Sequence, residues 1–306
     1  MHKIEIDDRS VTREFPSEIH EMDQSQFIFF MELVLQYTSG QISIAQFKVF
    51  LIKKLLNIRY DLHYARLSVN EKDEIAGNII ILSELCESFF EEIQQDGKLV
   101  KSFKLSFVKN FIPSVCSKYF GPADALQDAT FCEYRMAHSH LVAYLHSHDE
   151  HEMDRLIAVL YRPRKRFLWL RKKFKSFDGQ DREPITSKTN PAILERRAQR
   201  IARLPKAVRY GIFLYFSGSE EFLVKGKPVV DGKEIDFSII YASSDDSSDS
   251  PDIGLIGILY SLAETKVFGS IQETDDQNLY DIMIRLYQVK KQADALEAKY
   301  KSNDPN

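Results

Sequence analysis

The chain has 306 residues, of which 44% are hydrophobic and 28% are charged, and its formal net charge is −4. This hydrophobic content is ordinary for a protein that buries a core, so disorder along most of the chain is excluded. The near balance of charge excludes attraction to a polyanion by bulk charge, so any contact with nucleic acid must be local. The length suits two ordinary domains or one large domain.

Three cysteines, Cys86, Cys116 and Cys132, stand far apart, and no CxxC pair occurs. The spacing of a zinc ribbon or a thioredoxin motif is therefore absent, and we expect free thiols in a reducing cytoplasm. The first residues contain no apolar signal-peptide core. The longest apolar runs, FIFFMELVLQY and IGLIGILYSLA, are shorter than the ~20 residues that a membrane-spanning helix needs, so no contact with a membrane is expected.

The opening residues, 3–6 and 10–15, alternate polar and apolar side chains and predict a small hairpin. Beyond them the pattern becomes helical, with a helix expected over 70–94 and a second hairpin within 99–122. Helix starts are indicated by residue pairs that have capping-box spacing: Asp23 with Gln26, Ser43 with Gln46, and Thr130 with Glu133. The apolar stripes predict these core positions: Phe30, Leu35, Phe50, Leu85, Tyr134, Leu145, Leu156 and Leu160.

Five of the eight histidines lie between His138 and His151, in HSHLVAYLHSHDEHEMD. His138 and His140 project from different faces of the predicted helix, because alternate residues are about 200° apart, so they cannot chelate one ion together. His146, His148 and His151 are the remaining candidates for a metal site. Neither HExxH nor HxxEH spacing occurs, so we expect no metal or other cofactor. A metal-dependent enzyme built on this cluster is the weakest hypothesis.

The run RPRKRFLWLRKKFK, residues 162–175, contains no acid and surrounds the single tryptophan. It predicts an interaction surface formed by Arg162, Arg164, Lys165, Arg166, Trp169, Arg171, Lys172, Lys173 and Lys175. Cations interleaved with aromatic residues can bind single-stranded nucleic acid by charge and stacking. The alternative is an amphipathic segment with Phe167, Leu170 and Phe174 turned inward and cations facing an acidic partner. We favour a protein partner and keep nucleic acid as the alternative.

Residues 176–190 are rich in Gly, Pro, Ser, Thr and Asn and predict a linker between an N-terminal domain, 1–175, and a C-terminal part, 191–306. The C-terminal part begins with a basic helix after Asn190-Pro191 and ends with two helices. Between them lie a small hairpin and an acidic loop that contains Asp245, Asp246, Asp249 and Asp252. The expected fold is mainly α with small β-hairpins, a minor β component, arranged as two packed helical regions.

Catalytic templates do not occur in the chain: it has no GxSxG, no GxGxxG and no GxxxxGK[ST] motif. Carboxylate pairs such as Glu91-Glu92 stand in polar surroundings, where a raised pKa is not expected. Nothing in the sequence assembles a nucleophile, a base and an orienting group, so we expect a protein that is not an enzyme.

Three segments resemble proteins of tailed phages and prophages: FPSEIHEMDQSQFIFFMELVLQY, YFGPADALQDATFCEYRMA and MDRLIAVLYRPRKRF. The resemblance covers residues 10–170 and consists of helix caps and core positions, without a catalytic motif. It implies a structural or tail-assembly protein that works through contacts with other phage-type proteins or with itself. It also implies a location in the cytoplasm of a bacterial host or in the virion.

Overall fold

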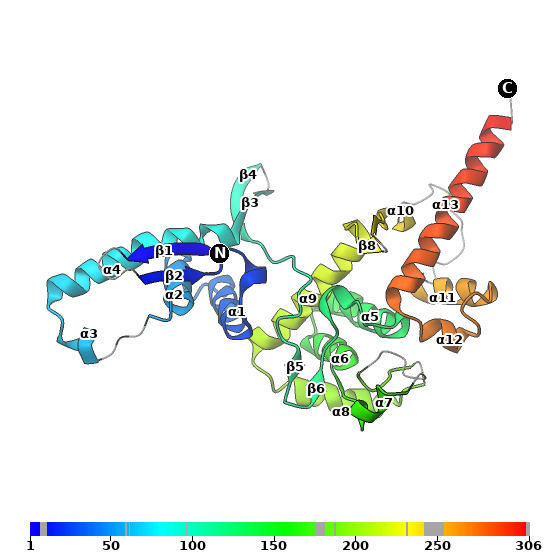
Figure 1. Ribbon diagram of the computed structural model, residues 1–306, viewed down its shortest axis with the longest axis horizontal. Helices are drawn as coiled ribbons and strands as arrows, with labels where there is room; N and C mark the ends of the chain where they lie inside the picture. The colour runs from blue at the N-terminus through cyan, green and yellow to red at the C-terminus, as the bar shows by residue number, and fades with distance from the viewer. Residues whose placement is uncertain are drawn as a thin grey trace. The chain divides into compact units, whose positions relative to one another are not determined.

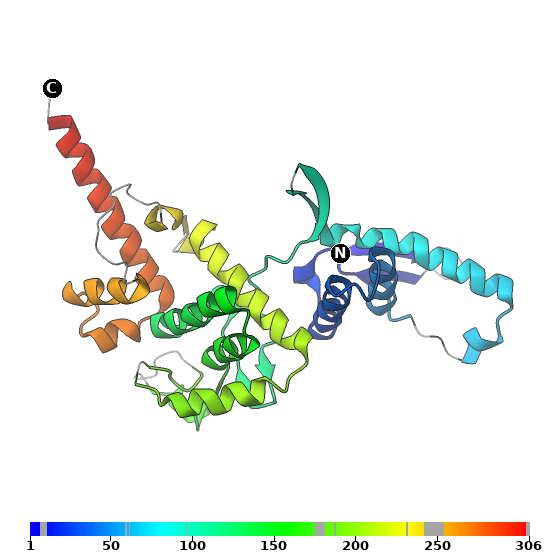
Figure 2. The same ribbon diagram turned by 180° about the vertical axis from the view of Figure 1, so that it is seen from behind.

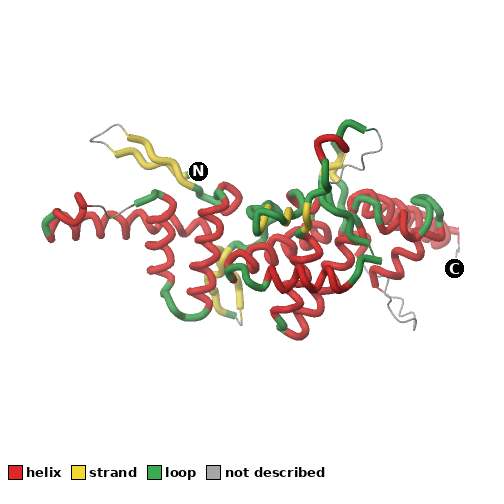
Figure 3. Tube along the Cα trace, turned by 90° about the horizontal axis from the view of Figure 1, so that it is seen from below, coloured by secondary structure: helices red, strands yellow, loops and turns green. Residues whose placement is uncertain are grey.

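The computed structural model describes residues 1–6, 11–58, 60, 62–95, 97–174, 181–186, 188–230, 232–241 and 254–303. Helices make up most of the described chain, and the strands form short antiparallel pairs or a small three-stranded sheet (Figures 1 and 3). The fold is therefore mainly α with small β-hairpins, as the sequence predicts.

The chain divides into two compact units, each described below by itself. The first consists of Met1–Phe107 with Pro205–Gly211, and the second of Val108–Leu204 with Ile212–Asn306. This division does not coincide with the linker expected at 176–190, which falls inside the second unit. Among the described residues of this stretch, Arg182 is only 2% exposed and Ile185 only 3%, so both are packed into the core of the second unit.

The first unit contains two hairpins, β1–β2 and β3–β4, and a group of helices. Its elements are β1 (His2–Ile6), β2 (Val11–Phe15), η2 (Ile19–Glu21), α1 (Gln24–Thr38), α2 (Ile44–Leu55), α3 (Leu62–Arg66), α4 (Val69–Ser83), η3 (Glu84–Phe89), β3 (Phe90–Gln95) and β4 (Lys98–Phe103). The capping boxes predicted at Asp23 and Ser43 start α1 and α2 and are confirmed. The first predicted hairpin is also confirmed, although residues 7–10 lie outside the described chain.

Phenylalanine rings fill the core of the first unit. The ring of Phe47 on α2 packs against three others, at centroid distances of 5.7, 5.6 and 5.0 Å: Phe30, Phe90 and Phe103. Such tilted and edge-on ring pairs add about 0.5–1.5 kcal/mol each to the burial of their area. These contacts join α1 and α2 to the β3–β4 hairpin.

The helix expected over 70–94 is shorter than predicted. It ends at Ser83, is followed by the 3₁₀ turn η3, and then passes into β3. Phe89 and Phe90 are both buried, and packing them into the aromatic core outweighs the helical pattern that precedes them. The second hairpin accordingly spans residues 90–103, around Gly97 with φ of 75°, and begins earlier than the sequence predicts.

Four of the predicted core residues are fully buried: Phe30, Tyr134, Leu156 and Leu160. Leu35 is half-buried. The prediction is wrong for three that are exposed: Phe50, Leu85 and Leu145. Local geometry explains two of them, because α2 buries the face that carries Phe47 and Leu51, and because η3 replaces the α-helical period at Leu85.

The second unit is a helical assembly with a small sheet of order β5–β6–β7 and one further hairpin. Its elements are β5 (Ser114–Val115), β6 (Tyr119–Phe120), η4 (Asp124–Leu126), α5 (Phe131–Ser147), α6 (Glu150–Leu160), β7 (Arg162–Pro163), α7 (Leu168–Arg171), α8 (Pro191–Ile201), the larger part of α9 (Lys206–Lys225), β8 (Val229–Val230), β9 (Lys233–Glu234), α10 (Ser238–Tyr241), α11 (Gly254–Glu264), α12 (Ile271–Asp275) and α13 (Leu279–Asn303). Helix α6 packs between α5 and α8 (Figure 2). The acidic loop lies outside the described residues.

The first prediction concerns the aromatic core. Phe47→Ala removes a ring that is fully buried among three others, so it should lower the free energy of unfolding by about 3–5 kcal/mol. Phe50→Ala, on the same helix but 38% exposed, is the matched control and should cost about 1 kcal/mol or less. Urea denaturation of the full chain, followed by circular dichroism, measures both. Equal losses would show that the core is assigned to the wrong face of α2.

Candidate functional site

A buried carboxylate, Glu133 on α5, binds two guanidinium groups in the second unit. Its Oε2 accepts a hydrogen bond from Arg162 Nη2, and its Oε1 accepts one from Arg182 Nη1, both at 2.6 Å. Arg182 Nη1 also donates to the carbonyl oxygen of Leu160 at 2.9 Å. Both arginines are 2% exposed and Glu133 is fully buried. Burial lowers the pKa of Arg162, and the charge of Glu133 opposes this shift.

This cluster corrects two predictions. Arg162 and Lys165 were expected on an interaction surface, but both are buried. Thr130 caps α5 as predicted, since its Oγ1 accepts from the backbone N of Glu133 at 3.2 Å. The side chain of Glu133 does not return to the cap, however, because it is held by the two arginines, so the predicted capping box is wrong.

Two histidines of the cluster, His140 and His151, pair with carboxylates of neighbouring helices. His140 Nδ1 lies 2.7 Å from Glu152 Oε2, and His151 Nε2 lies 2.8 Å from Glu195 Oε1. Arg155 donates to both carboxylates, at 2.6 Å to Glu152 and 3.2 Å to Glu195. This network of alternating charges joins His140 on α5, Glu152, Arg155 and His151 on α6, and Glu195 on α8. Burial alone would raise the pKa of Glu152, but the His140 hydrogen bond and the Arg155 charge outweigh burial and lower it.

The three candidate metal ligands are not brought together. His148 ends α5 in a left-handed conformation, with φ of 54°, and its ring lies edge-on to Tyr144. His146 is exposed in the last turn of α5, whereas His151 is paired with Glu195 from the first turn of α6. Across the described residues, no group of three or more His, Cys, Asp or Glu side chains is arranged to hold a metal ion.

Residues 164–174, the exposed aromatic segment, present apolar rings to solvent. The alternative in which Phe167, Leu170 and Phe174 turn inward is wrong, because these side chains are 71, 41 and 59% exposed. Trp169, predicted on the interaction surface, is 66% exposed. The physical reason is that α7 is only four residues long and follows Phe167 in a left-handed conformation, so no continuous amphipathic helix forms. Lys175 lies outside the described residues.

Five predicted interaction cations of the exposed aromatic segment are exposed: Arg164, Arg166, Arg171, Lys172 and Lys173. Several have partners within the chain. Lys172 Nζ lies 2.9 Å from Asp181 Oδ2, and Lys173 Nζ lies 5.4 Å from the centroid of the Trp169 ring. The Cζ atom of Arg164 lies 3.9 Å from the centroid of Phe120, within the range of a cation–π contact. Three of the five exposed cations therefore already contact an acid or an aromatic ring of the same chain.

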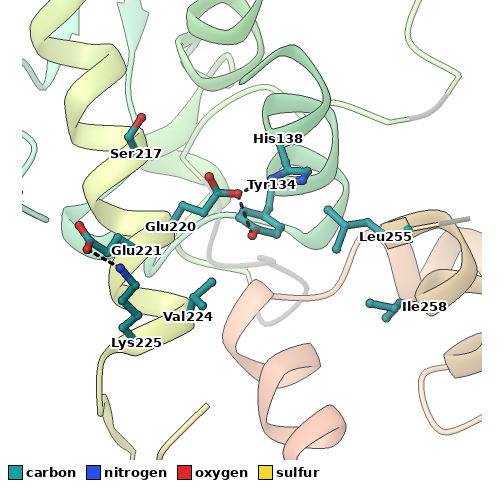
Figure 4. Close-up of a pocket in the computed structure, with 10 residues that line it drawn as sticks. Tyr134, His138, Ser217, Glu220, Glu221, Val224, Lys225, Leu255 and Ile258 are labelled. Carbon is teal, nitrogen blue, oxygen red and sulfur yellow. Dashed lines mark hydrogen bonds and ion pairs between the residues drawn. The ribbon is translucent and has the colours of Figure 1, made fainter. Parts of the chain in front are cut away.

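A cavity of about 700 Å³ lies among α5, α9 and α11 (Figure 4). The Tyr134 hydroxyl donates to Glu220 Oε1 at 3.2 Å, and His138 Nδ1 contacts the same oxygen. Ser217 also lines the cavity, but Figure 4 shows it directed away from His138, and no hydrogen bond joins these two described residues. A serine nucleophile with a histidine base is therefore not assembled here.

Sequence reasoning placed His138 among core residues and missed this cavity. Its partner Glu220 is 82 residues away, and no motif links the two positions. The only signal was the i, i+4 spacing of Tyr134 and His138, which puts both on one face of α5.

Comparisons with models of protein families, with curated proteins and with solved structures find nothing that matches this chain. Within the part of the chain that the structure describes, no helix is both long enough and apolar enough to cross a bilayer. Function therefore has to be inferred from two features, the exposed aromatic segment and the cavity at Glu220.

The second prediction concerns the buried carboxylate. Glu133→Gln keeps the shape of the side chain but leaves the buried Arg162 without a counter-charge and Arg182 with only the half-exposed Asp128, 3.2 Å away, so it should cost about 3–5 kcal/mol of stability. Glu195→Gln, which also removes a carboxylate paired with an arginine but at a more exposed position, should lose far less. Thermal and chemical denaturation of the full chain measure both variants. A Glu133→Gln protein as stable as the wild type would mean that this cluster does not hold the unit together.

The third prediction concerns acid stability. Because the folded-state pKa of Glu152 is lowered, its contribution is fully present above the unfolded value of about 4.3 and is lost as pH falls through the folded value. The stability difference between the wild type and Glu152→Gln should therefore be constant near neutral pH and shrink below about pH 4.3. Denaturation midpoints measured across that pH range test this. A difference that grows as the pH falls below about 4.3 would contradict the lowered pKa of Glu152.

Proposed function

We propose that this chain is a non-enzymatic binding protein that contacts other proteins through its exposed aromatic segment. The supporting observation is the exposure of Phe167, Trp169 and Phe174, each more than half exposed within one short stretch. Large apolar side chains gathered at the surface mark interaction sites, and Trp with Arg is the composition typical of the residues that dominate binding energy.

Charge supports a protein partner over a polyanion. Lys172 is already paired with Asp181, Lys173 lies over Trp169, and Arg164 lies over Phe120. A partner that offers apolar area and a few acids matches this arrangement better than a row of phosphates. The acidic loop of a second copy, which contains Asp245 and Asp246, would supply the acids of such a partner.

The resemblance to proteins of tailed phages supports the biological setting of this proposal. In that setting the chain is a structural or assembly protein of a phage-like element, acting in tail assembly. Its partners are other phage-type proteins or further copies of itself, in the cytoplasm of a bacterial host or in the virion.

A second candidate function is binding of single-stranded nucleic acid. The observation that favours it is Trp169, 66% exposed, with Lys173 above its ring and Arg166 and Arg171 exposed nearby in the chain. Bases can stack on such a ring while cations contact phosphates. This function differs from the first in its salt dependence, because each phosphate contact contributes about one unit to the log–log salt slope.

The fourth prediction tests the proposed function. The double variant Trp169→Ala/Phe174→Ala should weaken self-association of the full chain about tenfold or more, because it removes two exposed anchor rings. Tyr260→Ala, which removes another exposed ring, from α11, is the control and should leave association unchanged. Neutralising the acidic loop with Asp→Asn changes at 245, 246, 249 and 252 should weaken association in the same way. Sedimentation velocity measures all of these proteins, with the same experiment repeated at higher salt.

A labelled oligothymidine strand provides the second arm of the experiment. A wild-type chain that stays monomeric but binds this strand with a steep salt slope, lost in Trp169→Ala, supports the nucleic-acid function instead. A chain that neither self-associates nor binds the strand contradicts both self-association and nucleic-acid binding by the exposed aromatic segment.

A further inference from the structure

The cavity at Glu220 is separate from the exposed aromatic segment and has the features of a ligand site. Its volume of about 700 Å³ falls in the range of about 300–1,000 Å³ that is usual for small-molecule sites. It lies wholly within the second unit, with α5, α9 and α11 each supplying lining residues. Such sites combine apolar walls with a few polar groups that converge on one point.

The polar point of this cavity is the carboxylate of Glu220. Its side chain is only 16% exposed, so most of its hydration has been removed. The Oε1 atom accepts from the Tyr134 hydroxyl and contacts His138 Nδ1. No donor among the described residues reaches the other oxygen, Oε2, which Figure 4 shows on the side away from Tyr134 and His138. A carboxylate on a mostly buried side chain binds a hydrogen-bond donor that reaches it, and a cationic donor most strongly.

The other walls are apolar. Val224 on α9 faces Leu255 and Ile258 on α11 across the cavity (Figure 4). These side chains are only partly buried, so an apolar group placed between them would remove further apolar surface from water. The body of the ligand is therefore apolar.

The charge at the rim supports a cation over an anion. Lys225 Nζ lies 3.0 Å from Glu221 Oε1, one helical turn away, so this lysine is engaged by its own neighbour. Among the described residues, the ion-pair partner of Glu220 is therefore His138 and not this lysine. An anionic head group would meet the carboxylate of Glu220 and would be repelled.

We propose that this cavity binds a small molecule with an apolar body and a protonated amine head. The amine donates to Glu220 Oε2, and the body lies between Val224, Leu255 and Ile258. The Tyr134 hydroxyl and His138 hold the carboxylate in place through Oε1, which makes them positioning residues. The inference is independent of the protein contacts proposed above, because none of these residues belongs to 164–174.

The test uses the full chain and three probes of equal length, n-octylamine, n-octanol and octanoate, with binding followed by protein NMR shifts or calorimetry. Octylamine should bind about tenfold or more tightly than octanol, because a hydrogen bond to a charged group adds to the same apolar burial, and octanoate should bind most weakly. Glu220→Gln should remove the preference for the amine and leave octanol binding unchanged. Glu221→Gln is the matched control and should keep the preference, since Glu221 is paired at the rim.

A second variant guards against loss of the fold in Glu220→Gln. Leu255→Trp fills the cavity from the half-buried α11 side and should abolish binding of all three probes while the melting temperature stays near that of the wild type. Equal affinity for octylamine and octanoate would overturn the role of Glu220. Failure of every probe to bind the folded wild type would overturn the site itself.

Discussion

One carboxylate between two arginines organises the second unit. Glu133 is fully buried, and each of its oxygens receives a guanidinium nitrogen at 2.6 Å. Such a cluster adds little net stability compared with apolar side chains of the same volume, because removing three charges from water is costly. The cluster instead fixes the positions of the two arginines. Among the described residues, Glu133 is the only buried carboxylate that pairs with either of them. Arg162 fixes the strand that follows α6, and Arg182 fixes the segment that precedes α8.

Helix α5, which contains Glu133, also lines the cavity at Glu220 with a different face. Glu133 and His140 are seven residues apart, close to two helical turns, and both point to the side where α6 packs. Tyr134 and His138 are one turn apart and point to Glu220 on α9. Arg135 in turn contacts the buried Asp275 at 2.9 Å and so joins α5 to α12. Because α11 packs on α12, the far wall of the cavity depends on this contact as well.

Parts of this arrangement could be predicted from the sequence because their causes are local. Asp23 and Ser43 cap helices through partners three residues ahead, a spacing that any sequence displays directly. The burial of Arg162 and Arg182 could not be predicted, because their partner lies 29 and 49 residues away. The same holds for Glu220, which a sequence shows only as one acid among many on a helix. A basic run likewise cannot reveal which of its cations will find a buried counter-charge.

Contacts between residues distant in the sequence also explain why the rings within 164–174 are exposed. An amphipathic pattern turns its apolar face inward only if the backbone forms a helix long enough to present that face, and α7 has four residues. Arg162 is drawn inward by Glu133 at the start of this stretch, and Lys165 N donates to the Asp181 carbonyl oxygen at 2.9 Å. These contacts fix the backbone just before Phe167, and the helix that follows, α7, is too short to present one apolar face to the core. The burial of Arg162 at one end of the basic run and the exposure of the rings at the other end therefore have a single cause. The hydrogen bond from Arg162 to Glu133 fixes the course of the backbone after α6.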